Sequence, residues 1–112
     1  AVIPPTRWVM EKFILPKPGE GPSQDAQEKG CYDLRFYGKT DSGQEIRCKV
    51  TGNQDPGYGS TAKMLGQAAA CLVQDINKDK VQGGFWTPAS IFGAQLITRL
   101  ESHAGLTFEL ID

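Results

Sequence analysis

The chain has 112 residues, of which 39% are hydrophobic, and its formal net charge is −1. This length is enough for one domain with a modest core but short for an enzyme built of two lobes. The small net charge and the lack of a basic patch with interleaved aromatic residues exclude a strong electrostatic attraction to nucleic acid or to an anionic membrane surface. We therefore expect a single domain over residues 1–112, with neither nucleic acid nor a membrane as a partner.

The cysteines and the start of the chain bear on the cellular compartment. Cys31, Cys48 and Cys71 are an odd number without the short spacings of a metal site, which predicts neither a disulfide framework nor a zinc centre. We find no signal-peptide pattern and no apolar run near the ~20 residues of a membrane span. Ala1 in place of methionine indicates a processed or trimmed chain. A reducing compartment follows as the expectation, with the cytoplasm as the location.

Two short helices are predicted first. Thr6 is a suitable N-cap for a helix reaching about Leu15, which residues 16–19, rich in proline and glycine, would end. The apolar side of this helix, including Trp8, needs a partner surface, and we expect ordinary core packing, with an interface or membrane-surface role as the alternative. A second, charged helix is expected over residues 23–29 with a serine cap.

Alternation of apolar and polar residues then predicts a β-hairpin over about residues 31–51, around a turn at 40–43. The alternating apolar positions are Tyr32, Leu34 and Phe36 before the turn and Ile46, Cys48 and Val50 after it. One face of the hairpin should therefore be solvated. Parity places Cys48 on the apolar face and Cys31 on the other, so the two are not expected to bridge.

The stretch from Thr51 to Asp75 combines an irregular loop with the longest helical pattern. The helix should begin between Pro56 and Ser60, with Asp55 as the natural N-cap and a serine or threonine cap for a later start. On a helical wheel, one side is wet and the opposite side is apolar. The wet side holds Lys63, Gln67 and Gln74, and the apolar side holds Leu65, Ala68, Ala69, Leu72 and Ile76.

A loose dinucleotide-binding pattern lies at the start of this helix. Residues 57–62 fit G-x-G-x-x-A, and Asp75 and Asp79 follow at about the spacing of that fingerprint. The true motif needs a parallel strand directly after the helix, whereas residues 77–84 are polar and end in glycine. We therefore reject this match.

A second long helix should begin with Thr87 as N-cap and Pro88 as its first residue, and Gly105 should end it. Arg99 and Ser102 are expected on its wet side, and the lone His103 near its end, where a histidine favours the helix dipole. The buried stripe is expected to contain Ala89, Phe92, Gly93, Leu96, Ile97 and Leu100.

A terminal strand over about residues 106–111 would lie beside the hairpin. We thus predict an α+β fold, with a small antiparallel or mixed sheet made of the hairpin at 31–51 and the strand at 106–111. The two main helices should pack on one face of this sheet.

Three short segments carry a family resemblance: residues 18–23 (PGEGPS), residues 55–65 with Asp55-Pro56-Gly57-Tyr58 at their start, and residues 83–93 with Gly83-Gly84-Phe85-Trp86-Thr87-Pro88-Ala89. In this order they resemble the C-terminal region of the saccharopine dehydrogenase-like oxidoreductases, a group that includes the trans-acting enoyl reductases. The resemblance runs from about Leu15 to Leu110. It implies a parent protein with an N-terminal Rossmann domain for NAD or NADP and a second domain that shapes the substrate cleft and often the dimer contact.

On this resemblance the chain is the C-terminal substrate or dimerisation part of an oxidoreductase, inactive alone and without a cofactor of its own. Its partners would be the missing Rossmann domain, a small-molecule substrate and a second subunit. The alternative is a self-standing binding or assembly module without an enzymatic parent. The coding sequence upstream of Ala1 separates the two, because the first requires a strand followed by G-x-G-x-x-G there.

We assign no catalytic, cofactor-binding or metal-binding residue. Two loops, at residues 55–60 and 85–88, are predicted to face the substrate cleft. Tyr58 would donate a hydrogen bond to a substrate oxygen, and the adjacent helix N-terminus would stabilise negative charge that develops there. The alternative is that these loops only cap helices. The cleft candidates are Asp55, Gly57, Tyr58, Ser60, Trp86 and Thr87.

Overall fold

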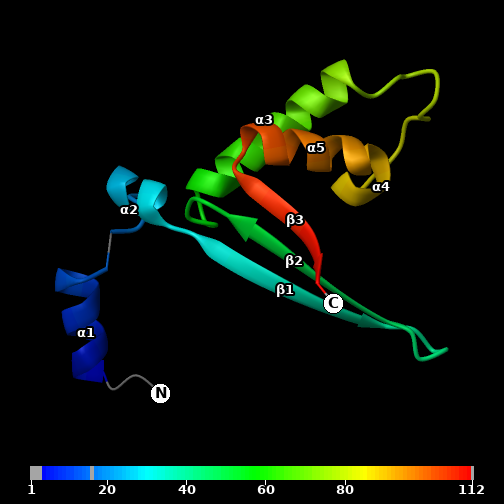
Figure 1. The fold of residues 1–112 in the computed structure, drawn as a ribbon. Helices are drawn as coiled ribbons and strands as arrows, with labels where there is room; N and C mark the ends of the chain where they lie inside the picture. The colour runs from blue at the N-terminus through cyan, green and yellow to red at the C-terminus, as the bar shows by residue number, and fades with distance from the viewer. Residues whose placement is uncertain (1–3, 16, 112) are drawn as a thin grey trace.

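The computed structural model describes residues 4–15 and 17–111, which form five helices and three strands (Figure 1). The expected short helices, hairpin, first long helix and terminal strand are found, and the second long helix is divided into two. In chain order the elements are α1 (Pro4–Phe13), α2 (Gln24–Lys29), β1 (Tyr32–Lys39), β2 (Glu45–Gly52), α3 (Gly59–Gln74), α4 (Pro88–Phe92), α5 (Ala94–His103) and β3 (Leu106–Ile111).

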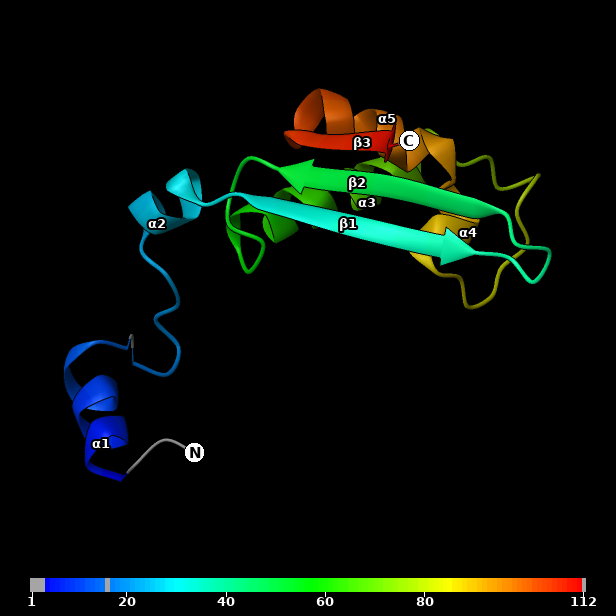
Figure 2. The same cartoon turned by 60° about the horizontal axis from the view of Figure 1, so that its bottom comes forward.

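The three strands form one antiparallel sheet in the order β1-β2-β3, seen face-on in Figure 2. The register places Phe36 opposite Cys48 and Cys48 opposite Leu110. Since side chains directly opposite one another share a face, alternation along the hairpin fixes the face of every residue in the sheet. The predicted hairpin and terminal strand are therefore confirmed, and the sheet is antiparallel rather than mixed.

One face of the sheet is solvated, as the alternation predicted. Lys49 pairs with Glu109 across β2 and β3 at 2.8 Å, and the hydroxyls of Thr51 and Thr107 are hydrogen-bonded on the same face. Cross-strand pairs of this kind stabilise a sheet modestly and tolerate water.

The opposite face is covered in part by α3 and α5 (Figure 1). The core is small, with Leu100 and Ala104 at the end of α5 buried against Leu106 of β3. Partly buried hydrophobic residues pack around them, namely Val50, Met64, Leu96 and Phe108. Burial of each large aliphatic side chain contributes about 1.5–3 kcal/mol, so these few residues hold the helices on the sheet.

The predicted apolar face of α3 is wrong for Leu65, Ala69 and Leu72, which are exposed, while Ala68 and Ile76 are half-buried. Leu65 is 71% exposed and Leu72 51% exposed, whereas Gln67 is half-buried and Cys71 fully buried. The helix is rotated by roughly a third of a turn from the expected orientation. The reason is that α3 turns Met64 toward the core around Leu100, and Gln67 toward Arg99 of α5, from which it accepts a hydrogen bond.

The second long helix is broken. Gly93 adopts φ +52°, a conformation that favours glycine, and separates α4 from α5. Phe92 and Leu100 are buried as predicted, but Ala89, Gly93 and Ile97 are exposed. Exposed Ser102 agrees with the prediction, and His103 is the last residue of α5.

α1 stands apart from the other elements, and within the described residues none of its side chains is buried (Figure 1). The expectation that Trp8 joins an ordinary core is therefore wrong here. Lys12 instead places its ammonium group 4.7 Å from the Trp8 ring centroid. The radius of gyration is 18.9 Å, compared with about 13 Å for a compact domain of this length. Pro16, expected to help end this helix, lies outside the described residues.

Over residues 4–15 and 17–111, no helix combines the length and the apolar content that crossing a bilayer requires. Ser23 caps α2 by accepting a hydrogen bond from the backbone N–H of Ala26, as predicted.

Candidate functional site

Asp55 organises the loop that precedes α3. Its carboxylate accepts hydrogen bonds from the backbone N–H groups of Gly57, Tyr58 and Gly59, and its carbonyl oxygen accepts one from Ser60. The hydrogen bond from the Gly59 N–H contributes most to holding the pKa of Asp55 below its ordinary value, and those from Gly57 and Tyr58 add to it. Asp55 thus satisfies backbone donors ahead of α3, but it is not the N-cap that we predicted. The helix begins at Gly59, inside the predicted window of residues 56–60, and its N-cap is Tyr58, which makes no side-chain cap hydrogen bond.

The first two motif segments lie together in space. The N–H of Asp55 donates to the carbonyl of Gln27 at 2.9 Å, which ties α2 to the loop. Gly30 lies so close that an added Cβ would be 2.6 Å from the Asp55 nitrogen, and the Tyr58 ring is 3.5 Å from the corresponding point on Gly21. α2 and the residue that follows it therefore pack on the Asp55 loop, and Gly21 of the PGEGPS segment lies against the Tyr58 ring.

Ser60 is only 1% exposed and is committed to the fold. Its hydroxyl is 2.8 Å from the hydroxyl of Tyr32 on β1, and either oxygen can donate. The Tyr32 ring occupies the space that a side chain at Gly52 would need. Ser60 therefore joins the first turn of α3 to the sheet, and Tyr58, which is 57% exposed, is the more accessible member of the loop.

The residues of this loop do not fit the pyrophosphate of NAD or NADP. Four backbone N–H groups at the start of α3 already donate to Asp55. A phosphate at this helix end would also face the Asp55 carboxylate and be repelled by it. The sheet is antiparallel, so the parallel strand that a dinucleotide fold places after the helix is not formed by the described residues.

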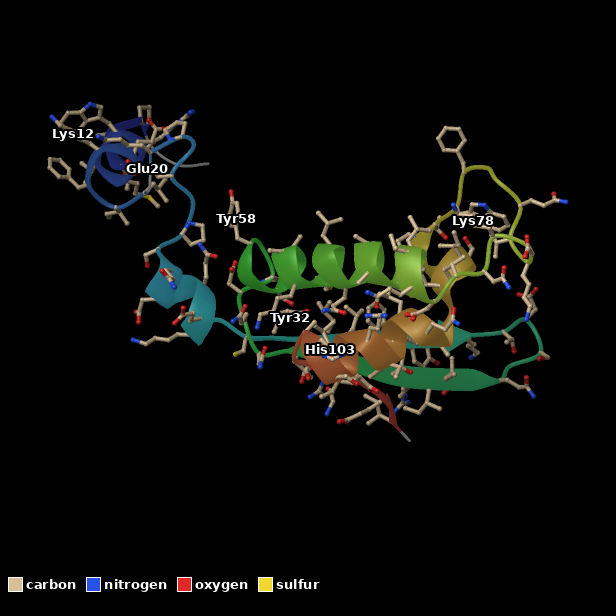
Figure 3. All side chains as sticks on the ribbon, turned by 90° about the horizontal axis from the view of Figure 1, so that it is seen from above. Lys12, Glu20, Tyr32, Tyr58, Lys78 and His103 are labelled. Carbon is tan, nitrogen blue, oxygen red and sulfur yellow. The ribbon has the colours of Figure 1, made fainter. Side chains whose placement is uncertain are left out.

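Trp86 and Thr87 lie at the far end of α3 from the Asp55 loop. The helix has 16 residues and so is about 24 Å long. Figure 3 shows Tyr58 at one end of α3 and Lys78, just beyond the other end, on the far side of the molecule. The structure thus brings Asp55, Gly57, Tyr58 and Ser60 together but not Trp86 and Thr87, so the six candidates do not form one site within the described chain.

Thr87 caps α4. Its hydroxyl accepts a hydrogen bond from the backbone N–H of Ser90, and the Ser90 hydroxyl accepts one from the backbone N–H of Thr87, which is a capping box. The predicted cap is confirmed. The indole N–H of Trp86 donates to the Gln82 carbonyl at 3.0 Å, which fixes the ring against the preceding loop.

An apolar pocket of about 510 Å³ opens beside the Trp86 ring, between the C-terminal part of α3, the following loop and α4. Its volume lies in the range of small-molecule sites. Lys78 is the charged residue among those that line it. The main apolar lining residues are Leu72, Val73, Ile76, Val81, Trp86 and Ile91. The sequence interpretation assigned Leu72 and Ile76 to the core, and no local pattern in the sequence indicated a pocket here.

A polar network joins the ends of the two long helices. Arg99 of α5 pairs through Nε and Nη2 with both carboxylate oxygens of Asp75, and Nη2 also donates to Gln74 at 2.7 Å. The expectation of a solvated Arg99 is therefore wrong. The hydrogen bond from Arg99 holds the pKa of Asp75 below its ordinary value. Burial, followed by the neighbouring Asp75, raises the pKa of the Cys71 thiol, so this cysteine is protonated and inert.

Metal chemistry finds no support in the described part of the chain, where no cluster of three or more histidine, cysteine or acidic residues is found. Cys31, Cys48 and Cys71 are all unbridged there.

Comparison with known proteins finds trans-acting enoyl reductases among the relatives of this chain. A protein of Mycobacterium tuberculosis, named as a candidate trans-acting enoyl reductase, is 36% identical over 98 residues, which are 88% of this chain and 23% of the relative. The trans-acting enoyl reductases of Mycobacterium bovis and Mycobacterium ulcerans are 38% and 37% identical over 87 residues, which are 78% of this chain and 21% of each relative. No protein-family profile matches the chain, and no solved structure matches it.

The chain is therefore similar to a part of the trans-acting enoyl reductases and spans less than a quarter of their length. This agrees with one half of the resemblance noted from the motifs. The wider saccharopine dehydrogenase-like grouping stays a prediction.

Proposed function

We propose that this chain is the substrate-binding or subunit-contact part of an NAD(P)-dependent reductase, and that it does not catalyse the reaction alone. The observation that carries the proposal is the 36–38% identity to trans-acting enoyl reductases along most of this chain but under a quarter of theirs. The name of those relatives indicates an α,β-unsaturated acyl group as substrate. The nicotinamide nucleotide would bind to a Rossmann domain elsewhere in a longer polypeptide.

The loop before α3 supports the proposal that the nicotinamide nucleotide binds outside this chain. Its N–H groups are engaged by Asp55, so the dinucleotide-like pattern at residues 57–62 is a helix start and not a phosphate cradle. Nucleotide binding would then depend on residues outside this chain.

The pocket beside Trp86 is the part of the chain that we propose to contact substrate. Its lining is mainly apolar, so it suits the hydrocarbon portion of an acyl group, and Lys78 at the lining suits an anionic group carried by the acyl donor. Tyr58 and the Asp55 loop remain cleft candidates only if the rest of the longer protein approaches that end of α3.

The test measures NADPH oxidation by the longer protein with short-chain and long-chain enoyl thioesters. Trp86→Ala should raise KM for the long-chain thioester by roughly tenfold, the loss expected for one well-packed apolar contact, and change NADPH affinity little. Phe85→Ala is the matched control, because the adjacent Phe85 side chain is fully exposed and does not line the pocket. Equal kinetics for the two variants would remove the pocket from the substrate site.

The assignment of the Asp55 loop and the alternative of a self-standing binding module have separate tests. The chain expressed alone, checked for folding by circular dichroism, should show no saturable NADPH binding at micromolar concentrations. Saturable binding would contradict our assignment of the Asp55 loop. An upstream coding sequence without a strand and G-x-G-x-x-G would instead favour the module over the reductase.

We also propose a second subunit as a partner and the cytoplasm as the location. The unbridged cysteines of the described chain support a reducing compartment.

A further inference from the structure

β1 is an edge strand of the three-stranded sheet, and its outer side has no partner strand among residues 4–15 and 17–111 (Figure 2). It is eight residues long and contains neither proline nor a bulge that would interrupt pairing. An edge of this kind offers a row of backbone N–H and C=O groups to any approaching strand. Natural edges are commonly shortened, interrupted by bulges, covered or charged. β1 carries charged side chains, but it is neither short nor interrupted by a bulge, and no described element covers its outer edge.

The same strand carries apolar side chains that the helices leave uncovered. Leu34 and Phe36 are 50% and 51% exposed, although they lie on the helix-covered side of the sheet, opposite Val50 and Cys48. The core contacts of α3 and α5 are made with β2 and β3 instead. Leu65 and Val73 on the outward side of α3 are exposed as well. An open strand edge and uncovered apolar side chains thus occur together on β1.

We propose that another part of the same longer polypeptide, outside residues 1–112, adds a strand to the outer edge of β1 and covers Leu34 and Phe36. We choose a strand from the same polypeptide because the matching relatives are long enough to supply it. The relative from Mycobacterium tuberculosis is more than four times as long as the segment that this chain matches. The inference rests on the proposed function only in requiring that longer polypeptide. α1 is helical and cannot supply the strand.

Amide hydrogen exchange in the longer protein tests the proposal. In an edge strand, alternate N–H groups point toward the neighbouring strand and the others point outward. The β1 amides that bond to β2 serve as an internal control, since they are protected in either case. The outward amides should exchange roughly 100-fold more slowly than the amides of Asp41 and Ser42 in the hairpin turn, for which no hydrogen bond is found within the described chain. Exchange at the rate of the turn would overturn the proposal.

The same measurement distinguishes the source of the added strand. Protection supplied by the same polypeptide is independent of protein concentration, whereas protection supplied by a second copy grows with concentration. Concentration-dependent protection would overturn the proposal. If the outward amides are protected but the longer protein does not oxidise NADPH with any enoyl thioester, only the proposed function fails.

A pair of variants provides a second measurement. Phe36 and Tyr37 are neighbours with similar exposures of 51% and 57%, but they lie on opposite faces of the sheet. In the longer protein, Phe36→Asp should lower Tm at least about twice as much as Tyr37→Asp, because it places a charge in a covered apolar contact. Equal shifts would show that the Phe36 side of β1 is open to water and would overturn the proposal.

Discussion

At the scale of single residues, Asp55 connects three parts of the chain. Its carboxylate satisfies the N–H groups that start α3, and its own N–H is bonded to α2. A helix start whose donors are all engaged costs less to bury than one with orphaned donors. A ligand must therefore compete with Asp55 for the backbone donors of this loop.

This arrangement makes the stability contributed by Asp55 dependent on pH. The hydrogen bonds depress the pKa of Asp55 in the folded state. Its stabilisation is therefore complete above the unfolded carboxyl pKa of about 3.9 and disappears as the pH falls through the lower folded value. Asp55→Asn should lower Tm at pH 7. The difference in Tm between the variant and the unmodified protein should become smaller in acid.

Thermal unfolding from pH 7 to strongly acidic pH checks this expectation. Asp41→Asn is the control, because Asp41 is exposed in the hairpin turn. A gap for Asp55→Asn that stays constant over the whole pH range would contradict the charge-based explanation.

At the scale of elements, α4 shows how a short helix is held in place. Thr87 and Ser90 form a reciprocal cap, and Gly93 ends the helix with a positive φ. A helix of five residues has too few internal hydrogen bonds to be stable by itself. Its position beside the Trp86 pocket therefore depends on these end groups.

Removal of the cap should be measurable. Thr87→Ala should lower the free energy of unfolding by about 1 kcal/mol, because the backbone N–H of Ser90 loses its acceptor. Thr87→Ser keeps a hydroxyl at the same place and should cost less than half as much. Denaturant titration measures the free energy of unfolding of both variants. Equal losses of stability would indicate that the threonine methyl group, and not the hydroxyl, stabilises α4.

At the scale of the whole molecule, few buried residues join the helices to the sheet. Leu100 is 7% exposed and contacts the small core around Leu106. Leu100→Ala should destabilise the fold by about 2–5 kcal/mol through lost burial and the cavity left behind. Leu100→Met conserves volume and should cost less than about 1.5 kcal/mol. Urea unfolding measures the free energy of unfolding of both variants. A loss below about 1.5 kcal/mol for Leu100→Ala would show that the main core lies elsewhere.

Local chemistry made much of this fold predictable. The hairpin followed from a period-two pattern, which fixes a face without knowledge of distant residues, and the caps at Ser23 and Thr87 followed from their own side chains. The orientation of α3 did not follow, because it depends on Arg99, which lies 32 residues beyond Gln67. The prediction that Trp8 packs in a core failed for a related reason. An apolar helix face indicates that a partner surface is needed, but the pattern does not say whether this chain contains that surface.

The candidate site was predictable in part. Turn chemistry pointed to Asp55 correctly, since aspartate before proline and glycine commonly organises a loop. The separation of Trp86 from Tyr58 was missed, although the length of the intervening helix already required it. The pocket beside Trp86 could not be derived, because its walls come from two helices and the loop between them.

The contact between Tyr32 and Gly52 has a consequence for tolerance to mutation. The aromatic ring sits in the place of a missing side chain, and its hydroxyl reaches Ser60 beyond it. Even one methyl group at position 52 would push the ring away, break its link to the serine and loosen the first turn of the long helix. A saturation library at this position, selected for folded protein, would return glycine alone.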